Sequence, residues 1–134
     1  EWGRPDMFML KLFKAAKQKK TFYLNNFGNH SRDFTYIGDV IKIVDKLIRK
    51  KITKHEIFNI CSNNSINIYK IVKKFKKDNY LKLKLVKLHK ADVIKTHGDN
   101  TKIKTFLPFK KFSNFNKKFN DTLKWYNENS IHKL

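Results

Sequence analysis

The hydrophobic positions in the first third of the chain predict two helices and two short strands. Residues 7–17 place apolar side chains at helical spacing, and the preceding Pro-Asp pair suits a helix start. Residues 21–24 (TFYL) are typical of a short strand and lead into a polar turn over 25–29. Residues 34–37 (FTYI) alternate like a second strand. Residues 40–48 then carry one apolar stripe of a helix, which we expect to face the core.

The rest of the chain continues the alternation of strands and helices. Residues 57–61 (IFNIC) form a short apolar run of the kind buried in a mixed or parallel sheet. Residues 68–75 have helical spacing, and residues 81–85 (LKLKL) alternate like a half-exposed strand. A short helix over 100–108 and a last helix over 113–128 complete the pattern. About five helices with only a few short strands predict an α/β fold.

Polar side chains at two places are expected to cap helices. Asp39 precedes the apolar stripe of the second helix and is well placed as its cap. Ser65 or Asn67 could cap the helix that follows them, because both side chains accept hydrogen bonds from helical N–H groups.

Length and composition indicate one folded domain over residues 1–134. The chain is 40% hydrophobic, has twelve phenylalanines, and contains no internal repeat or flexible linker. No apolar run approaches the roughly 18–20 residues that span a bilayer, so we expect no membrane association. Cys61 is the lone cysteine and lies in an apolar segment, where a buried, inert thiol is expected. These features favour a cytoplasmic location.

The net charge of +20 raises the possibility of nucleic-acid binding. Only three of the 31 basic residues are arginine, although arginine is the better reader of base edges and phosphates. The chain is also rich in Asn, Ile and Phe, as strongly AT-biased coding would make it. We therefore attribute the charge to composition and do not expect specific nucleic-acid binding, while a basic nucleic-acid-binding module stays an alternative.

The sequence lacks the residues that several kinds of active or binding site require. A dinucleotide site needs a glycine-rich turn between a strand and a helix, and the four glycines are too far apart to form one. One cysteine and five scattered histidines show no metal-ligand spacing. We therefore predict no catalytic residue, no metal site and no NAD site of this kind in the chain.

Two segments nevertheless resemble a known family. Residues 1–7 (EWGRPDM) and 32–39 (RDFTYIGD) are similar to motifs of the bacterial UDP-glucuronate 4-epimerase branch of the NAD-dependent nucleotide-sugar epimerases, which belong to the extended short-chain dehydrogenase/reductase family. The similarity continues through residues 58–60 (FNI), 91–93 (ADV) and 125–126 (WY), and so covers essentially the whole chain in order. Cys61 and Ala91 stand where relatives have glycine.

The resemblance implies contacts with the phosphates and the sugar of a UDP-sugar. Arg32 corresponds to an arginine that contacts the pyrophosphate, for which a guanidinium fork is well suited. Arg4 corresponds to an arginine near the sugar end of the pocket, where a uronic acid carboxylate needs a cation. His89 stands where relatives carry Arg or Gln, which puts a second phosphate contact there in doubt.

The same resemblance implies contacts with the uridine. Phe22, Tyr23 and Leu24 fall where the family passes a strand alongside uracil, and core packing is an equally good explanation for them. Asp92 corresponds to an aspartate near the ribose hydroxyls, with loop capping as its alternative.

The resemblance implies a C-terminal substrate-binding lobe without the Rossmann half. In the intact family NAD and a Tyr/Lys pair perform the epimerisation, and both belong upstream of these motifs. We therefore expect a truncated or split gene product that binds a UDP-sugar, is inactive alone and is completed by a separately encoded NAD-binding half. A degenerate fragment without function is the other alternative.

Overall fold

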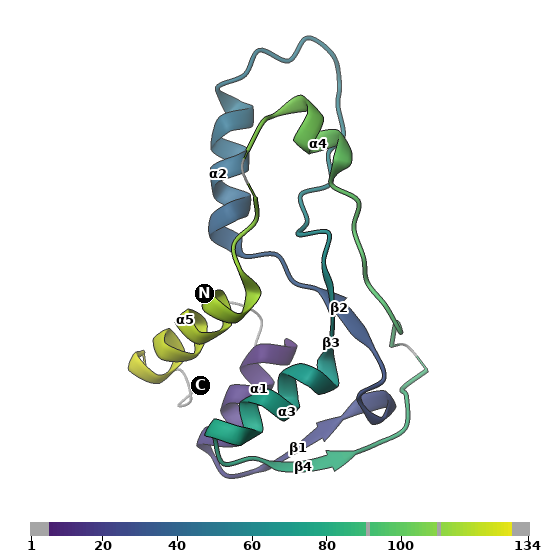
Figure 1. Ribbon diagram of the computed structural model, residues 1–134, viewed down its shortest axis with the longest axis vertical. Helices are drawn as coiled ribbons and strands as arrows, with labels where there is room; N and C mark the ends of the chain where they lie inside the picture. Colours follow the sequence, from purple (N-terminus) through teal and green to yellow (C-terminus); the bar gives the residue numbers. More distant parts are fainter. Residues whose placement is uncertain (1–5, 91, 110, 130–134) are drawn as a thin grey trace.

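The computed structural model describes residues 6–90, 92–109 and 111–129. Figure 1 shows two parts, one above the other, joined by extended segments. The described elements are five α-helices, four short strands and one 3-10 turn: α1 (Phe8–Lys17), β1 (Thr21–Leu24), η1 (Asn25–Gly28), β2 (Ser31–Asp33), α2 (Ile37–Ile48), β3 (Ser65–Asn67), α3 (Ile68–Asp78), β4 (Lys82–Leu85), α4 (Thr101–Phe106) and α5 (Phe115–Glu128). The α/β class with few short strands is confirmed.

The strands form two small sheets. β1 and β4 run parallel, with Thr21 opposite Lys82 and Leu24 opposite Leu85. β2 and β3 run antiparallel, with Arg32 opposite Ile66. Because β1 and β4 are parallel, a crossover must join them, and α3 lies in this crossover.

The main core lies between α1, α3, α5 and the β1–β4 pair. Phe13 of α1 is its centre, with ring centroids 5.8 Å from Phe75, 5.3 Å from Phe119 and 5.6 Å from Tyr126. α3 contributes the four apolar positions that its periodicity predicted, and all of them are buried. The buried members of the main core are Leu12, Phe13, Phe22, Leu24, Ile68, Ile71, Val72, Phe75, Leu81, Phe119 and Tyr126.

A second, smaller core lies in the upper part of Figure 1, between α2 and α4. We call it the upper core. Its buried members are Ile43, Ile103 and Leu107. Aromatic and aliphatic side chains that are only partly buried surround them, including Leu47, Phe58, Ile60, Phe106, Phe109 and Phe112.

The strand expected over residues 34–37 is wrong. The ladder of β2 stops at Asp33, opposite Ser65, and α2 already begins at Ile37. Phe34 instead packs its ring against Phe8 and Phe115, at centroid distances of 6.0 and 5.1 Å. The alternating pattern of residues 34–37 therefore belongs to a segment that pairs with no other strand in the described structure.

The strand expected over residues 57–61 is also wrong. The segment forms no ladder, because no described strand lies beside it. Phe58 and Ile60 still pack on the upper core, whereas Ile57 and Asn59 are exposed. This alternation is that of an extended segment with one face on a core and no neighbouring strand.

The apolar stripe of α2 is not buried as expected. Ile43 is buried, but Ile41, Val44 and Ile48 are 60%, 40% and 79% exposed. The upper core covers only one side of α2, so the wider apolar surface of this helix stays open.

The helix caps were predicted with mixed success. The Asn67 side chain accepts a hydrogen bond from the Lys70 N–H, at 3.1 Å, and caps α3 as proposed. Asp39 is not a cap, because α2 begins two residues earlier. Its two carboxylate oxygens instead accept hydrogen bonds from the Ser113 N–H, at 2.7 Å, and the Ser113 hydroxyl, at 2.8 Å. Asp39 therefore ties α2 to the segment before α5.

Candidate functional site

A cavity of about 770 Å³ brings together three segments that lie far apart in the sequence. These are the end of β1, the strand β2 with the residues on either side of it, and the segment 92–96. α1 and the start of α5 close its sides. Of the predicted site residues, the cavity walls include Phe22, Tyr23, Leu24, Arg32 and Asp92.

Arg32 is held at the edge of β2 by backbone contacts. Its Nη1 donates to the Ser31 carbonyl, at 2.9 Å, and has a longer contact of 3.5 Å with the Ile94 carbonyl. Within the described part of the chain no carboxylate pairs with this guanidinium. Arg32 therefore keeps N–H donors and a full positive charge for an anionic ligand.

The segment 92–96 runs alongside β2 because backbone hydrogen bonds hold it there. The Ser31 N–H donates to the Ile94 carbonyl, at 2.9 Å, and the Thr96 N–H donates to the Ser31 carbonyl, at 3.1 Å. The Thr96 hydroxyl also accepts from the Asp33 N–H, at 3.0 Å. These bonds place Asp92 and Arg32 on the same cavity although 60 positions separate them.

Asp92 lies beside the turn that follows β1. Its carboxylate accepts a hydrogen bond of 2.5 Å from the Asn25 side-chain amide. Gly28 ends this turn with φ +81°, and a Cβ there would meet the Tyr69 Cβ at 2.7 Å, so glycine is required. The turn thus brings Asn25 and Asp92 together, a carboxamide and a carboxylate suited to hydroxyl groups.

The three β1 residues divide between the core and the cavity. Phe22 and Leu24 point into the main core, as the packing alternative proposed, and Tyr23 is exposed. The Leu24 carbonyl accepts from the Val86 N–H, at 3.0 Å, so the backbone groups of Leu24 face β4. Successive residues of a strand direct their backbone N–H and C=O groups to opposite edges of the strand. The backbone groups of Tyr23 therefore face the edge of β1 that is not paired with β4.

His30 is a candidate that the sequence analysis did not select. It precedes Arg32 by two positions on one extended segment and lines the same cavity. Its buried Nδ1 has no hydrogen-bond partner in the described structure. Burial lowers the pKa of His30 below its usual value, the charge of Arg32 lowers it further, and Asp92 acts in the opposite direction. The two-residue spacing from Arg32 was the signal that could have found it.

Two predicted residues remain, of which only His89 is described. His89 is exposed and does not line it, although its carbonyl accepts the Asp92 N–H at 2.9 Å. His89 can thus position the loop of Asp92 through its backbone. Arg4 lies outside the described residues.

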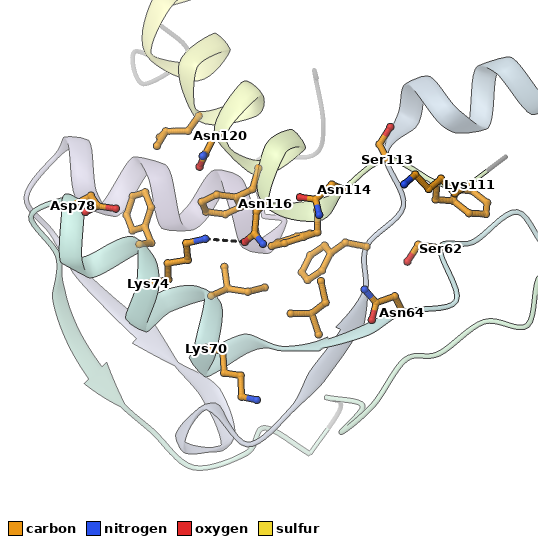
Figure 2. A pocket seen from close by; sticks show the side chains of 18 of the residues that line it. Ser62, Asn64, Lys70, Lys74, Asp78, Lys111, Ser113, Asn114, Asn116 and Asn120 are labelled. Atoms are coloured by element: carbon orange, nitrogen blue, oxygen red, sulfur yellow. Dashed lines mark hydrogen bonds between the residues drawn. The ribbon is translucent and has the colours of Figure 1, made fainter.

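A second cavity, of about 830 Å³, lies between α3 and α5 (Figure 2). Phe34, Phe115 and Phe119 separate it from the first cavity, since these side chains line both. Four lysines line it, and Lys74 Nζ donates to Asn116 Oδ1 at 3.1 Å, as Figure 2 shows. It contains no arginine and none of the predicted site residues, so we place the candidate site in the first cavity.

Within the described residues, no group of three or more metal-ligating side chains is present. None of the helices there has the length and apolar character needed to cross a membrane.

The depressed pKa of His30 predicts a pH dependence of stability. The unfolded chain binds this proton with the ordinary pKa of 6.5, and the folded chain binds it less tightly. Unfolding therefore takes up a proton as the pH falls below about 6.5, and stability decreases in that direction. We expect a lower urea midpoint at pH 5.5 than at pH 7.5, and a smaller difference in His30→Gln.

Other groups with shifted pKa values do not act in this range. Asp99 and Asp121 have lowered pKa values because of hydrogen bonds to Thr101 and Lys118, respectively, and they lose their contribution only below about pH 4. An unchanged pH difference in His30→Gln would contradict the prediction.

Comparisons with known proteins find similarity to one family of enzymes. A model of the NAD dependent epimerase/dehydratase family matches residues 2–61. An uncharacterised protein of Methanocaldococcus jannaschii is 30% identical over 131 residues, which are 96% of this chain and 40% of that protein. A UDP-glucuronate 4-epimerase of Thermodesulfobacterium geofontis is 29% identical over 130 residues, with 95% and 40% coverage.

Solved structures show the same fold. UDP-glucuronic acid 4-epimerase from Bacillus cereus in complex with NAD has a TM-score of 0.74 and 25% identity, over 92% of this chain and 40% of that one. MoeE5 in complex with UDP-glucuronic acid and NAD has a TM-score of 0.85 at 19% identity, with 94% and 43% coverage.

This chain thus spans about two fifths of the length of its relatives, and the matched portions are the C-terminal ones. The motif around Arg32, the α/β fold and these matches agree with one another. The chain is thus similar to the C-terminal part of NAD-dependent nucleotide-sugar epimerases of the extended short-chain dehydrogenase/reductase family.

Proposed function

We propose that this chain is the UDP-sugar-binding part of a nucleotide-sugar 4-epimerase of the UDP-glucuronate 4-epimerase type. The observation that carries the proposal is the cavity in which Arg32 lies near His30, Asp92 and the open edge of β1, and no carboxylate of the described residues pairs with Arg32. Similar folds occur in proteins solved with UDP-glucuronic acid.

Each cavity residue has a part in this proposal. The Arg32 guanidinium pairs with the pyrophosphate oxygens through charge-assisted hydrogen bonds. Asp92, supported by Asn25, accepts hydrogen bonds from ribose hydroxyls. The open edge of β1 at Tyr23 offers backbone groups to uracil.

The glycines of the described residues do not form a dinucleotide-binding turn. Gly28 lies between two strands, Gly38 lies inside α2, and Gly98 packs against Cys61 before a helix of only six residues. None forms the glycine-rich turn that lets a pyrophosphate approach the backbone. In an intact epimerase, bound NAD would supply hydride transfer from the sugar and back to it. In our proposal a separate NAD-binding half supplies that chemistry.

Titration calorimetry and a turnover assay with the purified chain test the proposal. We expect UDP to bind, and UDP-glucuronate to bind with similar affinity, because the pyrophosphate provides the main contact. We expect no interconversion of UDP-glucuronate and UDP-galacturonate, even with added NAD. Absence of UDP binding would overturn the binding role, and turnover by this chain alone would overturn the assignment of catalysis to another half.

A further inference from the structure

The second cavity, between α3 and α5, has no part in the proposed binding of UDP. Its volume of about 830 Å³ lies within the range of sites for small organic molecules, roughly 300–1,000 Å³. None of the residues assigned to UDP lines it, and Phe34, Phe115 and Phe119 separate it from the first cavity. It therefore offers a separate space for a ligand.

The floor of the second cavity is apolar. Ile71 and Phe75 come from α3, and Phe119 and Leu123 come from α5. The rings of Phe75 and Phe119 meet edge to face, with their centroids 6.0 Å apart. Both rings belong to the main core, which holds the floor in place. A ligand with an apolar group that covers this floor would remove apolar surface from water, which favours binding.

The rim of the second cavity is basic. Lys70 and Lys74 extend from α3, Lys104 from α4 and Lys111 from the segment before α5, and all four residues are exposed. None of the four forms an ion pair within the described part of the chain. Among the described lining residues Asp78 is the one carboxylate, and Figure 2 shows it at the end of the cavity away from Lys111. The rim therefore attracts an anion.

Hydrogen bonds orient two asparagines so that each keeps an N–H donor. Lys74 Nζ donates to Asn116 Oδ1, and Asn114 Oδ1 accepts from the Lys117 N–H, both at 3.1 Å. The Nδ2 groups of these two amides keep their hydrogens for another partner. Figure 2 shows Asn114 and Asn116 together at the start of α5, with Lys74 reaching Asn116 from α3. Ammonium and amide N–H groups in one place suit carboxylate or phosphate oxygens.

The arrangement of these groups matters more than the number of lysines. Lysine is frequent throughout this chain, so a lysine-lined surface alone indicates little. Here the cations, the amide donors and the apolar floor border the same cavity. An anion without an apolar body would leave the floor in water, and an apolar molecule without charge would make no use of the lysines. The lining therefore suits a ligand that has both parts.

We propose that the second cavity binds an amphipathic organic anion. Its apolar body covers the floor, and its carboxylate or phosphate accepts hydrogen bonds from Lys74, Asn114 and Asn116. The lining contains no arginine, and a lysine ammonium binds such an anion as a point charge without a bidentate fork. This binding goes beyond the proposed function and does not depend on it, because the two cavities use different polar groups.

Titration calorimetry of the purified chain with naphthalene-2-carboxylate tests the proposal. Naphthalene-2-carboxamide has the same apolar body without the charge, and acetate has the charge without the body. We expect the naphthalene carboxylate to bind about tenfold or more tightly than either control, because only it uses both the floor and the rim. Equal affinities for the carboxylate and the carboxamide would overturn the anion site, as would failure of the carboxylate to bind.

Two-dimensional NMR of the same complex locates the bound molecule. We expect the amide signals of α3 and of the start of α5 to shift on titration with naphthalene-2-carboxylate. Shifts confined to α2 would place the molecule on the exposed apolar side of that helix and overturn the proposal.

Two substitutions test the donors at the start of α5. Lys74→Met removes the ammonium but keeps an apolar stem, and Asn116→Asp places a carboxylate beside Lys74. An acidic residue in the first turn of a helix is favourable, so the second variant should stay folded. Each change should weaken naphthalene-2-carboxylate binding about fivefold or more and leave the carboxamide within about twofold.

Lys73→Met is the matched control. Lys73 is exposed on α3 beside Lys74 but does not line the cavity, so its loss should leave the affinity for the carboxylate within about twofold. If Lys73→Met weakens the carboxylate as much as Lys74→Met does, the overall charge of the chain binds the molecule and the proposal is wrong. None of these measurements uses UDP, so failure of the proposed nucleotide binding leaves the test intact.

Discussion

Replacing Arg32 with alanine should weaken UDP binding about ten- to a hundredfold. The change removes a guanidinium that has no carboxylate partner among the described residues. Its charge-assisted hydrogen bonds to phosphate contribute on the order of 1.5–3 kcal/mol. Arg32→Lys should recover only part of the affinity, because an ammonium keeps the charge but not the bidentate geometry. Titration calorimetry with UDP at two salt concentrations measures both effects.

Arg49→Ala is the matched control for charge. Arg49 lies at the exposed end of α2, where its Nε and Nη2 donate to the Asp45 carboxylate at 3.0–3.1 Å. Its removal should change UDP affinity little beyond a general effect that salt screens. Equal losses at Arg32 and Arg49, both vanishing in salt, would show that diffuse charge rather than a built phosphate site binds UDP.

The substitution Phe13→Ala should have the largest effect on stability, about 3–5 kcal/mol. Phe13 is 1% exposed, and its ring contacts aromatic rings from α3 and α5. Its removal leaves a cavity where three helices meet. Because domains of this size are stable by only about 5–15 kcal/mol, much of the variant should be unfolded at low urea concentration. Urea unfolding followed by circular dichroism measures the loss.

Tyr80→Ala and Phe13→Leu are the two control variants for Phe13→Ala. Tyr80 is exposed in the turn between α3 and β4, so its truncation should change the unfolding free energy by no more than about 0.5 kcal/mol. Phe13→Leu keeps most of the buried volume and should cost less than Phe13→Ala. A loss at Phe13→Ala as small as that at Tyr80→Ala would contradict the central place of Phe13 in the main core.

The helices could be predicted because periodicity reports an apolar face directly. The α3 positions Ile68, Ile71, Val72 and Phe75 are all buried, and β1 has the predicted bounds. The failures have a common cause. A pattern shows that α2 has an apolar stripe or that 57–61 favours an extended, buried conformation, but it does not show what covers them. That information lies in another part of the chain or in another chain.

The residues of the candidate site could also be predicted only in part from the sequence. Arg32 and Asp92 were selected through the family resemblance, and the structure brings both to one cavity through the bonds between Ser31 and the segment 92–96. Their roles in UDP binding stay predictions. His30 was missed because its two-residue spacing from Arg32 was not considered, and a histidine taken alone carries no pattern. Its importance arises from burial and from the nearby Arg32 charge, which only the folded chain provides.

Because the two cores differ in size, we expect the parts of the molecule around them to unfold locally at different free energies. The upper core has three buried residues and the main core has eleven, so separating α2 from α4 exposes far less apolar surface than global unfolding. Amides of α2 and α4 should therefore exchange through a low-energy partial opening, while those of α1 and α3 report the full stability. The Asp39–Ser113 bonds oppose this opening, since they tie α2 to the start of α5. A molecule bound on the upper part would slow exchange there first and leave the slowest amides of the main core unchanged.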